Sequence, residues 1–184
     1  MDLIELIQKF HSTLPLVRGW IDDLLESHKD QTTPIISLDF HRLKQVFSST
    51  LLKKTKVVVV PGNVPFPPIS RMGLPELGLI ENMPMAGITY KDTFFITKAD
   101  QSESLHFHEL IHVVQWESLG VDNFLRAYGV GLMQFGYRDS PLEKMAYSLQ
   151  ETFDRGNTPF GIVDFIKRET GSIWANVVPL INRV

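Results

Sequence analysis

The sequence contains no cysteine among its 184 residues. This absence excludes disulfide bonds, thiolate zinc sites, iron–sulfur clusters and cysteine nucleophiles. Any metal ligands that the chain offers must therefore be histidine, aspartate or glutamate side chains.

Long apolar runs and basic clusters are also missing. No stretch approaches the run of about twenty apolar residues needed to cross a bilayer, so we expect no membrane span. Asp2 and Glu5 stand where a secretory signal would carry basic residues, so we expect no signal peptide and, by default, a cytoplasmic location. The net charge is −3 and the longest basic cluster, residues 53–56, is short, which argues against nucleic-acid binding.

The N-terminal third of the chain shows helical periodicity. Apolar residues at helical spacing fill most of the first thirty positions, and Pro15 separates or kinks the two helical segments that they predict. A polar loop over 29–34 and a short helix over 39–47 are expected next. Residues 56–60, one lysine and four valines ended by a Pro-Gly pair, predict a buried strand.

A segment rich in proline and glycine, 61–84, follows this strand. Structureless segments of this length in compact domains are often functional, so it either covers a cleft or wraps irregularly over the surface. Residues 87–90 and 93–96 flank Lys91-Asp92 and predict a β-hairpin. The sequence therefore predicts about three strands, all in the middle of the chain.

The remainder of the chain is predicted to be almost wholly helical, with Gly120 as a stop between two helices. The predicted helices cover 101–118, 122–135, 141–154, 159–169 and 172–182. Strands flanked by helices on both sides in sequence predict one mostly helical α+β domain over 1–184. Its parts are a helical N-terminal part (1–55), the sheet with its Pro-rich loop (56–100), central helices (101–155) and C-terminal helices (156–184).

The first of the central helices carries the pattern H-E-x-x-H, formed by His108, Glu109 and His112. Positions i and i+4 of an α-helix lie about 40° apart around its axis, so both imidazoles can reach one ion. Glu109 lies on the same side and can contact a water at the metal without binding the metal itself. Ser102, or Asp100 paired with Glu103, is a suitable N-cap for this helix.

An apolar face on the same helix supports the helical assignment. It is formed by four residues, and the histidine pair points away from it, which is where a pair lining a cleft is expected. These residues are Phe107, Leu110, Ile111 and Val114.

A catalytic zinc ion usually takes three protein ligands and keeps a further position for water. No histidine follows His112, so the third ligand is expected to be an acidic residue on a later helix. The available carboxylates include Glu143, Glu151 and Asp154.

Two segments resemble the motifs of gluzincin-type zinc metallopeptidases. Residues 108–115 resemble their H-E-L-x-H-V-V-Q helix, and residues 140–146 resemble the later segment in which E-x-x-A supplies the third ligand. The resemblance implies that Glu143 binds the metal and that Ala146 lets the two helices approach closely. Met145 and Tyr147 replace acidic residues common in relatives, which removes a carboxylate that would orient a ligand histidine.

The resemblance also implies a zincin-like domain, one zinc ion per chain and a peptide or protein substrate. In such enzymes an extended substrate lies along the edge strand before the active-site helix, here 93–97 or its partner 87–90. The oligomeric state is open.

Glu143 also has a purely structural interpretation. Ser140, Pro141 and Glu143 together form a good helix start, with serine as N-cap, proline at the first position and glutamate at the third. A capping glutamate of this kind needs no metal.

The remaining catalytic roles follow from the zinc hypothesis. Glu109 is the general base, and the developing oxyanion needs a donor besides the metal. Tyr137 is the first choice because it leads into the helix of Glu143, with Tyr128 and His106 as alternatives. His106 lies on the far side of its helix from His108 and is not expected to be a ligand.

Three classes of function are therefore distinguished. The first is a zinc-dependent hydrolase that cleaves peptide bonds. The second is a non-catalytic protein that keeps the zinc site and acts as a binding or regulatory module. The third is a helical interaction protein without a metal.

Overall fold

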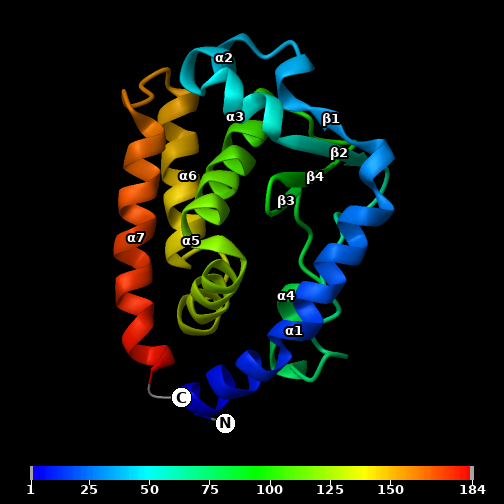
Figure 1. Ribbon diagram of the computed structural model, residues 1–184, viewed down its shortest axis with the longest axis vertical. Helices are drawn as coiled ribbons and strands as arrows, with labels where there is room; N and C mark the ends of the chain where they lie inside the picture. Colours follow the sequence, from blue (N-terminus) through cyan, green and yellow to red (C-terminus); the bar gives the residue numbers. More distant parts are fainter. Residues whose placement is uncertain (1, 183–184) are drawn as a thin grey trace.

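The computed structural model describes residues 2–182 and confirms a mostly helical α+β fold with a small sheet (Figure 1). The helices α5, α6 and α7 lie side by side, and the sheet and the N-terminal helix α1 lie on the other side of α5. The α-helices are α1 (Leu3–Ser27), α2 (His41–Val46), α3 (Ser49–Lys54), α4 (Gly78–Glu81), α5 (Glu103–Phe135), α6 (Pro141–Asp154) and α7 (Ile162–Ile181). Short 3₁₀ turns cover Lys29–Gln31, Ile35–Ser37 and Pro75–Leu77.

The sheet has four strands rather than three. The strands are β1 (Thr33–Pro34), β2 (Lys56–Val60), β3 (Gly87–Tyr90) and β4 (Thr93–Thr97), in the order β1-β2-β4-β3. The predicted strand over 56–60 and the hairpin are confirmed, and β2 pairs in parallel with β4. The strand β1 was not predicted, because it is only two residues long, both exposed, and lies in the predicted polar loop.

The N-terminal region is more helical than predicted. Pro15 does not separate two helices, because α1 runs through it, although its two halves follow different directions in Figure 1. Pro15 itself is exposed, while Leu14, Val17 and Ile21 continue one buried face along the helix and hold it together. The predicted helix over 39–47 is the shorter α2, and α3 was not predicted.

The helix α5 is bent at Gly120, whose φ of 72° and ψ of 171° are not helical. The predicted helices over 101–118 and 122–135 are therefore two halves of one element joined at this glycine. The N-cap of α5 is Ser102, whose side chain accepts a hydrogen bond from the backbone N–H of Leu105. The four residues of the predicted apolar face are fully buried, and so is every other residue from Leu105 to Trp116.

This complete burial has a structural cause. The helices α1, α2, α6 and α7 and the strand β3 all pack against α5 and surround it. Both histidines of the pair are therefore buried inside the molecule.

The bounds predicted for α6 are confirmed, whereas the two C-terminal helices predicted over 159–169 and 172–182 form the single helix α7. Ile166, Thr170 and Val177 form one continuous buried stripe along α7. Gly171 lies on the exposed side, where it does not interrupt that stripe.

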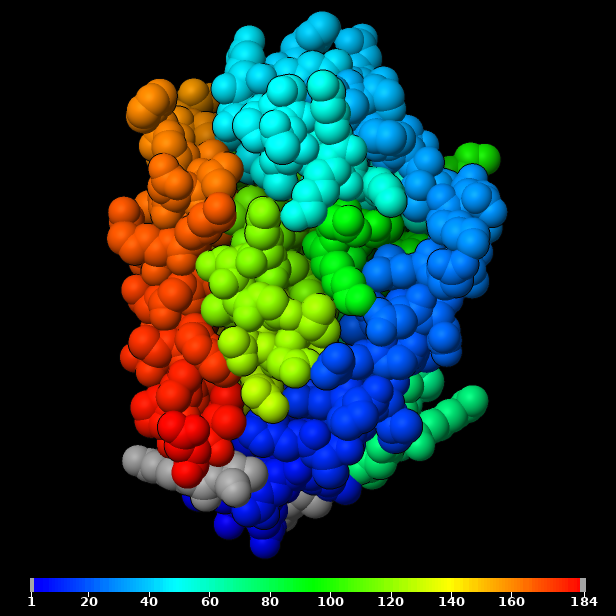
Figure 2. Space-filling view, in the orientation of Figure 1, coloured from blue at the N-terminus to red at the C-terminus, as the bar shows by residue number. Residues whose placement is uncertain are grey.

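Buried side chains form two hydrophobic clusters that share the sheet and α5. One lies between α1, the sheet and the second half of α5, and the other lies between α2, α3, the sheet and the helices α5, α6 and α7. Figure 2 shows the second half of α5 flanked by α7 on one side and α1 on the other. Within the described residues, no helix is both long and apolar enough to span a membrane.

Candidate metal centre

The side chains of His108, His112 and Glu143 come together between α5 and α6. Each offers one ligand atom, and these atoms lie within 4.8 Å of one another. The two histidine Nε2 atoms are 3.1 Å apart, and each is 3.5 Å from a carboxylate oxygen of Glu143. All three residues are at most 5% exposed. The predicted ligands therefore form a buried group that could hold a metal ion.

Glutamine side chains orient both histidines. The Nδ1 of His112 lies 2.8 Å from Oε1 of Gln115, and the Nδ1 of His108 lies 3.0 Å from Oε1 of Gln150. The Gln115 amide group donates to the carbonyl of Leu142, which fixes its oxygen toward His112 and makes Nδ1 the donor. An imidazole that donates from Nδ1 presents a lone pair at Nε2, the state in which it binds a metal.

This arrangement needs a positive charge at its centre. The two Nε2 atoms face each other, and Oε2 of Glu143 is a buried acceptor without a hydrogen-bond partner. Without a metal, a proton supplies that charge. Burial disfavours the charged imidazole, but the adjacent Glu143 carboxylate outweighs it and raises the pKa of His112 to about 9. Burial alone would raise the pKa of Glu143, yet the two histidines hold it well below its ordinary value. The donor set therefore fits a divalent cation.

Tyr128 fixes the carboxylate of Glu143. Its hydroxyl donates to Oε1 at 2.6 Å, which leaves Oε2 as the oxygen available to a metal. Burial and the charge of Glu143 raise the pKa of Tyr128 well above its ordinary value, so this hydroxyl stays protonated. Because its proton is already used, Tyr128 is a poor candidate for the oxyanion donor.

The helix-cap interpretation of Glu143 is wrong. The Ser140 side chain makes no capping hydrogen bond, and the Glu143 carboxylate faces Tyr128 and the two histidines. The alternative carboxylates lie on the surface, where Glu151 pairs with Arg155 and Asp154 is exposed.

Glu109 lies beside the three candidate ligands, and two residues of β3 hold its carboxylate. The Thr89 hydroxyl donates to Oε2 at 2.6 Å. A Cβ at Gly87 would lie 2.3 Å from Oε1, so only glycine leaves room for this carboxylate. Burial raises the pKa of Glu109 above its ordinary value, although the nearby histidines and Thr89 oppose the shift.

The remaining sequence candidates are divided between the site and the core. Tyr137 lines the same cavity as Glu143 and Glu109, and burial together with the charge of Glu143 raises its pKa. His106 lies elsewhere: its Nδ1 is bonded to the carbonyl of Ser102 and its ring packs between Phe40 and Phe94.

The sheet settles which strand is an edge next to the site. The strand β4 is paired on both sides, by β2 and β3, so the expectation that 93–97 receives a substrate is wrong. The strand β3 is the edge and packs against α5. The Thr89 carbonyl on β3 already accepts a hydrogen bond from Trp116 Nε1.

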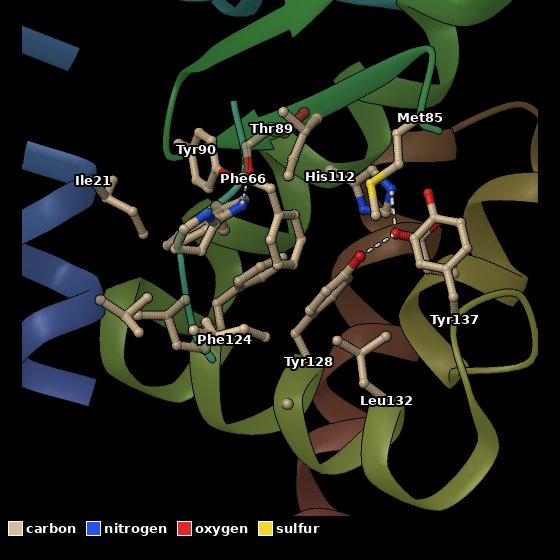
Figure 3. Close-up of a pocket in the computed structure, with 18 of the residues that line it drawn as sticks. Ile21, Phe66, Met85, Thr89, Tyr90, His112, Phe124, Tyr128, Leu132 and Tyr137 are labelled. Carbon is tan, nitrogen blue, oxygen red and sulfur yellow. Dashed lines mark hydrogen bonds and ion pairs between the residues drawn. The ribbon is translucent and has the colours of Figure 1, made fainter. Parts of the chain in front are cut away.

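A cavity of about 80 Å³ extends from the candidate ligands toward α1. Glu109, His112 and Glu143 line one part of it, and most of its other walls are apolar. Figure 3 shows His112, Tyr128 and Tyr137 at one end. The Pro-rich segment contributes Phe66, Pro67, Ile69 and Leu77, and Met85 directly follows it. The segment therefore covers this cavity, which is one of the two arrangements that the sequence left open.

Four residues that position the site were not predicted from the sequence: Gly87, Thr89, Gln115 and Gln150. Gln115 lies at i+3 from His112, so the helical spacing could have revealed it. Thr89, Gly87 and Gln150 reach the site from other elements, and nothing local in the sequence marks them.

No protein-family model, curated protein or solved structure matches this chain. The likeness to gluzincins therefore rests on the two short motifs alone, and function must be argued from the geometry.

Proposed function

We propose that this protein is a zinc-dependent hydrolase that cleaves peptide bonds. The observation that carries the proposal is the buried group of two imidazole Nε2 atoms and one unpartnered carboxylate oxygen, with a second carboxylate, Glu109, beside it. A group that only stabilised the fold would need no acidic neighbour lining the same cavity.

Zinc is the metal that these ligands favour. Two neutral imidazoles and one carboxylate form a usual ligand set of catalytic zinc sites, with a further position left for water. The absence of cysteine argues against softer, thiolate-preferring ions. One ion per chain is expected at His108, His112 and Glu143.

The protein side chains divide the remaining tasks. Zinc, when bound, acts as a Lewis acid that polarises a carbonyl and activates water. Glu109 takes a proton from the attacking water and returns one to the leaving amine, a role that a raised pKa favours. Tyr137 stays protonated and supplies a donor for the developing negative charge.

A non-catalytic zinc protein is the second candidate. It is favoured by the burial of the ligands, since structural zinc sites are closed to solvent. In that case Glu109 would be dispensable for every property of the protein, whereas in a hydrolase it is essential for turnover alone.

Metal content tests the site. We expect about one zinc per chain by elemental analysis of the wild-type protein, and loss or marked weakening in His112→Ala and Glu143→Ala. Glu151→Ala, an exposed glutamate on the same helix as Glu143, is the matched control and should keep its zinc. Wild-type protein that remains metal-free after zinc is supplied would favour the helical interaction protein instead.

Glu109→Gln separates the hydrolase from the non-catalytic alternative. The variant should keep its zinc but should no longer cleave the peptides of a diverse library. Mass spectrometry of the library detects the cleavage products. Glu117→Gln, at an exposed position on the same helix, is the control and should cleave like the wild type. If zinc-loaded wild-type protein and zinc-loaded Glu109→Gln both leave the library uncleaved, the result would support the non-catalytic zinc protein.

A further inference from the structure

The cavity beside the candidate metal centre has a polar end and an apolar end. Its polar part consists of Glu109, His112, Glu143 and the hydroxyl groups near them. Its other end lies near α1, where Figure 3 shows Ile21 opposite Phe66 and Phe124. An apolar end continuous with an acidic, histidine-containing end is suited to a ligand with an apolar group attached to a polar one.

The apolar walls come from parts of the chain outside the two motifs. Phe10 and Ile21 belong to α1, and Phe66 belongs to the Pro-rich segment. Phe10 reaches this position because Gly129 on α5 has no side chain: a Cβ there would lie 2.3 Å from the Phe10 ring. The end of the cavity is therefore set by a close contact between α1 and α5.

The polar atoms at the apolar end already have partners. The Tyr90 hydroxyl donates to the carbonyl of Pro65, and Trp116 Nε1 donates to the carbonyl of Thr89. A polar or charged group entering this end would lose its hydrogen bonds to water without replacing them. The apolar end therefore selects against polar groups.

The size of the cavity limits which apolar groups can enter it. Its volume of about 80 Å³ compares with ~150 Å³ for an engineered cavity that holds benzene. An aromatic ring would therefore require the walls to move, whereas a branched group of a few carbons fits.

We propose that this cavity receives a branched aliphatic group of the substrate, attached close to the carbonyl that is attacked. The proposal rests on the proposed hydrolase function and specifies its substrate: a peptide with a valine, leucine or isoleucine side chain next to the scissile bond. Burial of that group against Ile21, Leu125 and Phe124 supplies its binding energy.

Binding of small hydroxamic acids tests the proposal without any turnover. Three compounds share one metal-binding head and differ in the attached group: methyl (acetohydroxamic acid), isobutyl (3-methylbutanohydroxamic acid) and benzyl (phenylacetohydroxamic acid). Their affinities for zinc-loaded wild-type protein are measured by calorimetry. We expect the isobutyl compound to bind about ten- to fiftyfold more tightly than the methyl compound. The benzyl compound should gain less affinity, relative to the methyl compound, than the isobutyl compound does.

Variants that fill the cavity test whether the isobutyl group binds inside it. In Leu125→Phe the isobutyl advantage should disappear while the methyl compound binds as in the wild type, which also shows that the variant folds and holds zinc. Ile21→Phe fills the cavity from the opposite wall and should behave alike. Leu79→Phe, at an exposed position, should change nothing.

The outcomes distinguish the two proposals. Equal affinities for the methyl and isobutyl compounds, or a stronger gain from benzyl, would overturn the inference and leave the metal centre standing. An isobutyl advantage that survives in both filling variants would place the aliphatic group elsewhere and would also overturn it. Zinc-loaded protein that binds none of the three compounds would contradict the hydrolase function itself, because the metal would then be closed to ligands.

Discussion

At the residue scale, the position of Glu109 depends on two neighbours that no motif contains. Thr89 donates to one carboxylate oxygen, and Gly87 leaves the space that the other oxygen occupies. Both belong to β3 and face α5, two positions apart on the same side of the strand. The edge strand therefore positions the proposed base from outside its own helix.

Replacing the Thr89 hydroxyl should lower turnover without changing metal content. We expect Thr89→Val, which keeps the side-chain shape, to reduce kcat by roughly tenfold to a hundredfold with KM little changed, because Glu109 loses the bond that orients it. Thr89→Ser keeps the hydroxyl and should restore most of the rate. The assay is the cleavage rate of a peptide identified from the library.

Thr93→Val is the control for this change, since the Thr93 hydroxyl bonds to the Asp92 side chain. Equal rates for Thr89→Val and wild type would show that Glu109 needs no support from β3. Failure of Thr89→Ser to restore the rate would assign the loss to packing.

Tyr128 should affect the affinity for zinc rather than the orientation of Glu109. Removing its hydroxyl in Tyr128→Phe frees the Glu143 carboxylate to rotate, so the zinc dissociation constant should rise by roughly tenfold to a hundredfold. Competition with a chromophoric chelator measures this constant. Tyr90→Phe, whose hydroxyl bonds to Pro65 instead, should keep wild-type affinity, and equal weakening of both variants would contradict a specific role for Tyr128.

The candidate ligand residues were predictable, and the residues that orient them from other elements were not, for a physical reason. Helical spacing places His108 and His112 one turn apart, so a local pattern is enough to identify them. Gln150 is 42 residues away from His108 in sequence and meets it only because α6 packs against α5. Contacts of this kind depend on how helices pack, which a single sequence does not encode locally.

At the element scale, helix α5 owes its bend to one glycine. Gly120 has a positive φ in a backbone region open almost only to glycine, and a Cβ there would meet no atom within 4 Å. Gly120→Ala should therefore lower the free energy of unfolding through backbone strain alone, by about 1–3 kcal/mol. Chemical denaturation measures this difference.

Gly19→Ala is the matched control for this substitution. Gly19 lies inside α1 with no neighbour within 4 Å of an added Cβ, so alanine should raise the free energy of unfolding by roughly 0.4–1 kcal/mol. Equal effects of the two substitutions would contradict the assigned strain at Gly120.

The two errors in predicting where the long helices end have one common origin. Pro15 and Gly171 are usual signs of a helix end, yet α1 and α7 continue past them because both residues lie on exposed faces while the buried stripes remain unbroken. Local propensity was outweighed by tertiary packing in both helices. The glycine at 120 was interpreted correctly as an interruption, because there the backbone itself departs from the helix.

At the scale of the whole molecule, the candidate metal centre joins α5 to α6 and so couples metal binding to folding. Zinc that binds only the folded chain should raise the free energy of unfolding by ~2.7 kcal/mol at a free concentration one hundred times its dissociation constant. Denaturation with and without zinc measures this gain. His112→Ala should show little gain, and a chelator should remove it from the wild type.

The size of the zinc effect should depend on pH, because zinc and a proton compete for His112. The pKa of this residue in the metal-free fold is about 9, above its ordinary 6.5, so its protonated pairing with Glu143 contributes fully below pH 6.5 and is lost as pH rises through 9. Over that range the metal-free protein should lose stability while zinc binds more tightly, since fewer protons must be displaced. The difference in unfolding free energy between zinc-loaded and metal-free protein should therefore widen from pH 6.5 to 9. A constant difference across this range would show that zinc does not replace a proton at His112.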